Sequence, residues 1–171
     1  MAESLPEVWL RGPLADVPPL LQPAAHALLQ AMEEMKELMK DFPDDLLWKQ
    51  PAGVASPGFH LLHIAGVLNR LGTYAKGESL SEEQLRYLKE ESIAHQTSTS
   101  DLLKRVEEQI KRTIEQLKNT GESSLTNIRT VGRKALPSTV QGLLFHAAEH
   151  TMRHLGQLLV TVKFIKAGSS S

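Results

Sequence analysis

The fold is decided by residues 138–166, STVQGLLFHAAEHTMRHLGQLLVTVKFIK, near the end of the 171-residue chain. Ser138 followed by Gln141 is typical of a capping box, in which each side chain bonds the backbone N–H of the other residue. Behind this start, apolar residues recur at spacings of three and four and share one helix face: Val140, Leu143, Leu144, Ala147, Leu158, Val162 and Ile165. The stretch therefore predicts a long amphipathic helix from Ser138 to about Lys166.

Two further long helices are predicted in the first half of the chain. Three prolines between residues 17 and 23 fit a helix only in its first turn, so we expect the first helix to begin there and to end at about Asp41. Ser56 followed by Pro57 is a typical helix start, with serine as the N-cap and proline at the first helical position. The apolar spacing carries this second helix to about Ala75.

The middle of the chain predicts one more long helix and one short one. An amphipathic pattern begins near residues 98–101, and we expect the long helix to end before Gly121, a residue suited to a left-handed conformation. Before it, Ser81 and Gln84 have the spacing of a second capping box and indicate a short helical segment. Residues 122–136 are rich in Ser and Thr, and we expect a long loop with at most a short turn.

Four long amphipathic helices without a long alternating strand pattern predict an all-α protein, namely a four-helix bundle with a short extra helical segment. We expect a single domain over residues 17–166, which suits the chain length. An N-terminal extension (1–16) would precede it, and a disordered tail (167–171) would follow.

Composition excludes several classes of function. The 19 basic and 20 acidic residues give a formal charge of −1, which argues against a nucleic-acid partner. Cysteine is absent, so disulfides, thiolate catalysis and cysteine-ligated metals are excluded. No apolar run is long enough to span a membrane, and the first residues do not resemble a secretory signal. We therefore expect a cytoplasmic protein with no membrane partner.

Three of the seven histidines recur at intervals of four: His146, His150 and His154. On a helix, residues four apart lie one turn above each other, about 5–6 Å between Cβ atoms, so two such imidazoles can reach one metal ion. At 100° per residue, His154 falls within the apolar face, His150 at its edge and His146 further toward the polar side. The pattern therefore favours His150 and His154 as metal ligands, with His146 at the mouth of the site, behind a ligand, or as an extra ligand.

A third ligand has to come from another helix. His63 lies at the rim of the apolar stripe of the second helix and is the natural candidate, while His60, one turn earlier on the same side, competes with it. His26 and His95 are expected to be ordinary solvated residues.

Two motifs resemble the DinB-like family of metal-binding four-helix-bundle proteins. They are residues 56–66, SPGFHLLHIAG, and residues 146–157, HAAEHTMRHLGQ, and the likeness extends from about Val17 to Ile165. The resemblance implies His63, His150 and His154 as ligands of a divalent ion, zinc or nickel, in a bundle with a crossover connection. It also implies a homodimer, as in many members, and an activity among metal-dependent hydrolases or thiol-dependent transferases, although many members have no demonstrated reaction.

Three neutral imidazoles on a divalent ion leave at least one open position, where the ion could activate water or a low-molecular-weight thiol toward a small-molecule substrate. Gln157 lies close to both helical histidines in angle and could hydrogen-bond a ligand imidazole, and His60 is a further candidate for such support. No carboxylate general base is evident on the motif faces. The alternatives are a non-catalytic bundle that binds metal or senses a ligand, and a plain helical interaction protein.

Basic residues in the late loop, Arg129, Arg133 and Lys134, have two readings. They could attract an anionic substrate to the site, or they could be a solvated basic loop, which is the interpretation that we favour.

Overall fold

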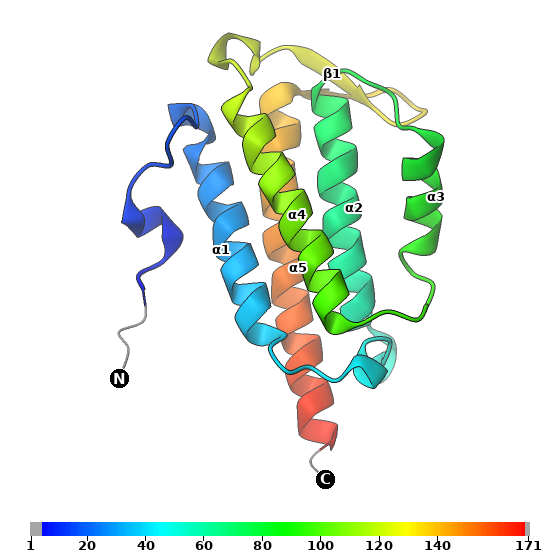
Figure 1. Ribbon diagram of the computed structural model, residues 1–171. Coiled ribbons are helices and arrows are strands. Elements are labelled where there is room, and N and C mark those ends of the chain that lie inside the picture. The colour runs from blue at the N-terminus through cyan, green and yellow to red at the C-terminus, as the bar shows by residue number, and fades with distance from the viewer. Residues whose placement is uncertain (1–4, 170–171) are drawn as a thin grey trace.

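Four long helices form a bundle with mixed parallel and antiparallel neighbours in the computed structural model (Figure 1). The structure describes residues 5–169. The arrangement confirms the predicted all-α four-helix bundle. The long helices and the short one between them are α1 (Gln22–Leu38), α2 (Pro57–Ala75), α3 (Glu82–Glu90), α4 (Thr99–Lys118) and α5 (Val140–Ser169). Short 3₁₀ turns lie in the connections, at Val8–Arg11, Pro19–Leu21, Asp44–Leu46, Pro51–Gly53 and Glu122–Ser124.

The connection between α2 and α4 is a crossover. α1 and α2 each pack against both α4 and α5, so the helices form a closed ring of neighbours. α2 and α4 run in the same direction, and the chain has to return along the length of the bundle between them (Figure 1). α3 lies in this return segment and packs against α2. The crossover therefore brings the residues after α3 back to the end of the bundle where α2 begins.

The bundle is held together by the apolar faces that the spacing predicts. All four long helices contribute side chains with almost no exposed surface, among them Leu28, Met35, Leu61, Ile64, Leu68, Ile110, Leu117, Leu158 and Val162. Burying one such side chain stabilises the fold by about 1.5–3 kcal/mol. These contacts fix α2 against α5, which is the pair that carries the histidine motifs.

Helix starts agree with the predicted caps at α2 and α3 and differ at α5. Ser56 Oγ accepts from Phe59 N at 3.2 Å, and the capping box of α3 is complete. At α5 the predicted capping box at Ser138 is wrong, because Ser138 belongs to a strand. The neighbouring residue caps the helix instead: Thr139 Oγ1 accepts from Gly142 N at 3.0 Å.

One predicted helix end is wrong, and at a second helix the end is as expected but the predicted left-handed glycine is not. α1 ends at Leu38 instead of Asp41, because the chain turns there to bury Phe42, and Asp41 takes a positive φ of 55°. α4 ends at Lys118, and Gly121 has a φ of −68° because it leads into a 3₁₀ turn instead of a left-handed cap.

A β-hairpin replaces most of the loop predicted for residues 122–136. β1 (Ile128–Val131) pairs antiparallel with β2 (Leu136–Thr139), and Ile128 lies opposite Thr139. Arg129 fastens the hairpin to the last turn of α2, since its Nε donates to Ala75 O at 2.9 Å. Four-residue strands are too short to show alternation, and a proline in β2 argued against a strand.

The N-terminal extension packs against α1, and α5 runs further than predicted. Within the extension, Val8 is buried, and Arg11 makes two hydrogen bonds with Glu33 of α1 at 2.7 and 2.8 Å. α5 continues to Ser169, so the prediction of a tail from residue 167 is wrong up to that residue, and residues 170–171 lie outside the described part. None of the described helices is both long and apolar enough to cross a lipid bilayer.

Candidate metal centre

Four histidines meet where α2 packs against α5. His60 and His63 lie in the first two turns of α2, and His150 and His154 face them from the middle of α5. The structure brings His63 together with His150 and His154, since one ring nitrogen from each lies within 4.8 Å of the others. The predicted set of three is therefore close enough to share one ion.

The spacing of the three rings fits a small divalent cation. His63 Nε2 lies 3.1 Å from His150 Nε2, and the ring centroid of His154 lies 4.5 Å from those of both His63 and His150. Nitrogen ligands at 2.0–2.1 Å around a tetrahedral zinc ion are about 3.3–3.4 Å apart. Phe59 stacks on His63 at 5.0 Å between ring centroids and limits its rotation. Small side-chain movements would therefore suffice to close the set around an ion.

Burial lowers the pKa of three of the four clustered imidazoles. It lowers the pKa of His150 to about 4 and that of His154 to about 3, and the positive charge of a protonated His63 acts in the same direction. Burial likewise lowers the pKa of His60 to about 4. Since metals bind the neutral ring, protons do not compete with a metal for His150 and His154 at neutral pH. His150 Nδ1 is buried and has no hydrogen-bond partner among the described residues.

The metal-free protein should lose stability as the pH falls from about 6.5 toward 4. In the unfolded chain the imidazoles take up protons near their ordinary pKa of 6.5, whereas the native ones do so only near 4 or 3. Between about pH 6.5 and 4 the unfolded state therefore binds more protons and is favoured. Above about pH 6.5 the imidazoles are neutral in the unfolded state too, so their burial does not lower the free energy of unfolding. Thermal unfolding midpoints of the metal-free protein between about pH 7.5 and 4.5 measure this. An unchanged midpoint across that range would contradict the shifted pKa values.

Glu91, just after α3, supports the cluster and was missed by the sequence analysis. Its side chain is 2% exposed, and its Oε2 accepts from His63 Nδ1 at 2.8 Å. Arg70 of α2, itself buried, donates to both oxygens of the same carboxylate. The proton of His63 is thus held at Nδ1, and the lone pair at Nε2 faces His150 and His154. Carboxylates commonly orient a metal-bound histidine in this way.

Gly66 provides the space for this carboxylate. A Cβ at Gly66 would overlap Glu91 Oε1 and would lie 2.6 Å from Arg70 Nη1 and 2.7 Å from the Tyr87 ring. The glycine that ends the first histidine motif therefore has a packing reason, because it lets the ion pair of Arg70 and Glu91 lie directly against α2.

The three residues predicted around the ligands differ in their placement. His60 is buried and supports the cluster, with its Nδ1 3.0 Å from His154 Nδ1, so that one of the two rings carries the shared proton. His146 is half exposed and bonds Glu149 at 3.1 Å, one turn from His150. Gln157 is exposed and makes no hydrogen bond to any of the described imidazoles. It lines an apolar groove beside His60 instead.

Other candidates lie away from the cluster. The hairpin with Arg129, Arg133 and Lys134 lies at the end of α2 opposite to His63, about 18 Å along the helix, so these cations do not line the centre (Figure 1). His26 bonds Gly12 O at 3.1 Å, and His95 bonds Ile93 O at 2.8 Å.

Comparisons with known proteins agree with this fold and these motifs. A family model described as the DinB superfamily matches residues 11–158. A crystal structure of a Streptococcus pneumoniae protein from a structural genomics consortium is similar, with a TM-score of 0.65 and 16% identity over 86% of this chain and 90% of that chain. This second likeness shows the fold. The comparison with curated proteins gave no match. The bundle with its two histidine motifs, and a family match over most of its length, show that the chain belongs to the DinB superfamily.

Proposed function

We propose that the protein binds one divalent ion through His63, His150 and His154 and acts on a small molecule, by hydrolysis or by transfer involving a small thiol. The convergence of three imidazole nitrogen donors from two helices is the observation that carries this proposal. Three protein ligands leave a position open for substrate, as in catalytic zinc sites. Imidazole suits both zinc and nickel, the two ions that we favour.

The chain's own residues prepare the donors. Glu91 holds the proton of His63 at Nδ1, so the lone pair of His63 Nε2 is directed toward His150, and His60 Nδ1 lies at hydrogen-bond distance from His154 Nδ1. A divalent ion bound there supplies Lewis-acid chemistry, which lowers the pKa of a bound water or thiol. Because the chain has no cysteine, a thiol would have to come as a co-substrate.

Replacing any one of the three ligands with alanine should abolish stoichiometric metal binding. We expect His63→Ala, His150→Ala and His154→Ala to retain well under about one tenth of the metal of the unaltered protein, because two imidazoles alone make a weak site. Elemental analysis after dialysis against zinc or nickel measures this directly. His26→Ala is the matched control, since that ring lies outside the cluster. Equal metal content in all four variants would refute the ligand assignment.

A non-catalytic role in metal binding or ligand sensing is the second candidate. This role is favoured because the two described carboxylates near the rings are both engaged: Glu91 bonds Arg70 and His63, and Glu149 bonds His146 and Arg153. A turnover screen of the metal-loaded protein with small esters, amides and electrophiles, each with and without a small thiol, separates the two. Turnover that disappears in His154→Ala supports the enzyme, and background rates throughout support the binding protein.

We also propose that the chain forms a homodimer through the outer face of α5. Val160 and Phe164 are each more than 60% exposed and line an apolar groove with Val54. Exposed apolar patches on soluble proteins are typical of contact surfaces. We expect Phe164→Lys to shift the mass measured by light scattering from dimer to monomer, whereas Lys163→Glu, one residue away, should not. A monomeric unaltered protein at micromolar concentration would contradict this proposal.

A further inference from the structure

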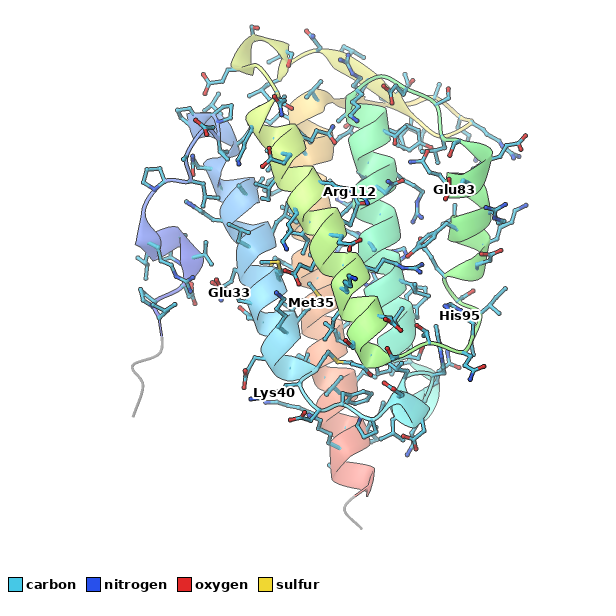
Figure 2. The ribbon with its side chains drawn as sticks, in the orientation of Figure 1. Glu33, Met35, Lys40, Glu83, His95 and Arg112 are labelled. Atoms are coloured by element: carbon cyan, nitrogen blue, oxygen red, sulfur yellow. The ribbon has the colours of Figure 1, made fainter. Side chains whose placement is uncertain are left out.

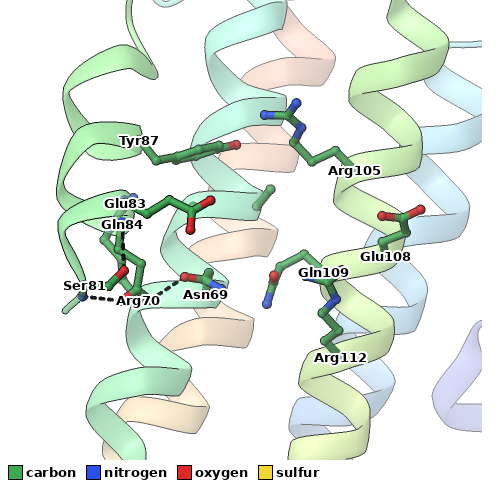
Figure 3. Close-up of a pocket in the computed structure, with 12 residues that line it drawn as sticks. Asn69, Arg70, Ser81, Glu83, Gln84, Tyr87, Arg105, Glu108, Gln109 and Arg112 are labelled. Carbon is green, nitrogen blue, oxygen red and sulfur yellow. Dashed lines mark hydrogen bonds between the residues drawn. The ribbon is translucent and has the colours of Figure 1, made fainter. Parts of the chain in front are cut away.

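A second cavity lies between α2, α3 and α4, apart from the histidine rings. Its volume is about 380 Å³, within the range of small-molecule sites. Figure 2 shows Glu83 on α3 and Arg112 on α4 on the two sides of α2, and Figure 3 shows Glu83 reaching from α3 into the space between them. On α2 the lining of the cavity includes the small residues Ala65 and Gly66.

Three of the charged side chains that line this cavity, Glu83, Glu108 and Arg112, have no ion pair with any described residue, unlike most other charges on α4. On the outer faces of α4, Glu107 pairs with Lys36 and Lys111, and Glu115 pairs with Lys118, all within 2.8 Å. Four of the side chains that line the cavity have no hydrogen bond or ion pair with any described residue, namely Glu83, Glu108, Gln109 and Arg112. Charges of both signs therefore point at one space without neutralising each other.

The buried wall adds to this polarity. Arg70 lines the cavity although it is only 7% exposed, and its charge is balanced by Glu91. Arg105 lies over the Tyr87 ring, with its guanidinium carbon 5.8 Å from the ring centroid, at the same edge of the cavity (Figure 3). The remaining cations and anions are equal in number, Arg105 and Arg112 against Glu83 and Glu108.

We propose that this cavity binds a small zwitterion of the α-amino-acid type, with its carboxylate toward Arg112 and its ammonium group toward Glu83. A ligand without net charge that carries both groups satisfies the cations of α4 and the carboxylate of α3 together. The carboxamide of Gln109 remains available for a polar side chain, so an amino acid with an amide side chain fits the lining best. Charge-assisted hydrogen bonds are about twice as strong as neutral ones, so these two pairs would supply much of the binding free energy of a small ligand.

Three related probes test each charge separately: L-glutamine, N-acetyl-L-glutamine, which lacks the ammonium group, and L-glutaminamide, which lacks the carboxylate. We expect L-glutamine to bind the full-length, metal-loaded protein and to shift the backbone amide signals of Gly66 and Gln109 in NMR spectra. Each modified probe should bind about 10- to 100-fold more weakly, since it loses one charge-assisted pair.

Variants then assign the charges to residues. Arg112→Gln should weaken the binding of L-glutamine about 10-fold or more but leave the binding of L-glutaminamide unchanged. Glu83→Gln should weaken the binding of L-glutamine to a similar extent but leave the binding of N-acetyl-L-glutamine unchanged. Arg86→Gln, on α3 but outside the cavity, is the matched control and should change nothing. His154→Ala should also retain binding, which separates this cavity from the histidine cluster. Failure of L-glutamine to saturate by about 10 mM, or equal effects of Arg86→Gln and Arg112→Gln, would overturn the proposal.

Discussion

Replacing Glu91 with alanine should lower the free energy of unfolding by about 3–5 kcal/mol and weaken divalent-metal binding by about 10- to 100-fold. The loss of stability follows because Arg70 would be left buried without its partner carboxylate. The loss of affinity follows because His63 Nδ1 would lose the acceptor that fixes its ring and tautomer. Urea unfolding of the metal-free protein measures the first effect, and titration against a competing chelator measures the second.

A double variant separates the two effects. Arg70→Met combined with Glu91→Leu replaces the buried ion pair with apolar side chains, a change that is often neutral or stabilising. We expect this variant to recover most of the lost stability while its metal affinity stays low, since His63 still has no acceptor. Glu90→Ala, at the exposed neighbouring residue, is the control and should resemble the unaltered protein. Normal metal affinity in the double variant would show that Glu91 has only a structural role.

The helices, and the pair of histidines His150 and His154 on α5, were predictable because the sequence patterns that indicate them are local. Ser56 and Pro57 define the start of α2 by chemistry that acts within one turn, and the structure begins the helix there. The spacing of His150 and His154 places them on one face of any helix, whatever it packs against. The bundle followed from the apolar periodicity of four long segments, which is the strongest signal a single sequence carries.

The choice between His60 and His63 could not be made from spacing alone. Both lie on the side of α2 that faces α5, and which ring meets His150 depends on how the two helices cross. In the structure His60 Nδ1 lies 3.0 Å from His154 Nδ1, whereas His63 is the residue that lies within ligand distance of both His150 and His154. The family resemblance suggested His63, and packing now provides the physical reason.

Glu91 could not have been found because its role depends on the crossover. It follows a run of charged residues at the end of α3, where a carboxylate is ordinarily solvated. Only the return of the chain along the bundle places it beside Arg70 and His63. The hairpin was missed for a different reason, since its four-residue strands carry no readable period.

The orientation of the candidate ligands therefore depends on residues that lie further from the proposed metal position. The rings of His63 and His154 are oriented by Glu91 and His60, and Glu91 is held in turn by Arg70. The outermost requirement is a residue without a side chain at position 66, because the ion pair occupies the volume that a Cβ would take. A substitution that does not alter any ionisable group should thus disturb the metal centre.

Gly66→Ala should test this directly, with a loss of about 2–4 kcal/mol in the free energy of unfolding and weaker metal binding. Alanine favours a helix over glycine by about 1 kcal/mol, so propensity alone predicts the opposite sign. The new methyl group would displace the side chains of Glu91 and Arg70, which are both buried, and so break their ion pair away from water. Thermal and urea unfolding, together with metal titration, measure the outcome.

Gly156→Ala is the matched control, because a Cβ there would meet nothing within 4 Å on the exposed side of α5. It should stabilise the protein by about 0.5–1 kcal/mol through helix propensity and leave metal affinity unchanged. If both glycine variants were stabilised alike, the space at Gly66 would not be needed by the ion pair. Opposite signs at two helical glycines, with metal affinity falling only for Gly66→Ala, would tie the packing of α3 on α2 to the orientation of His63.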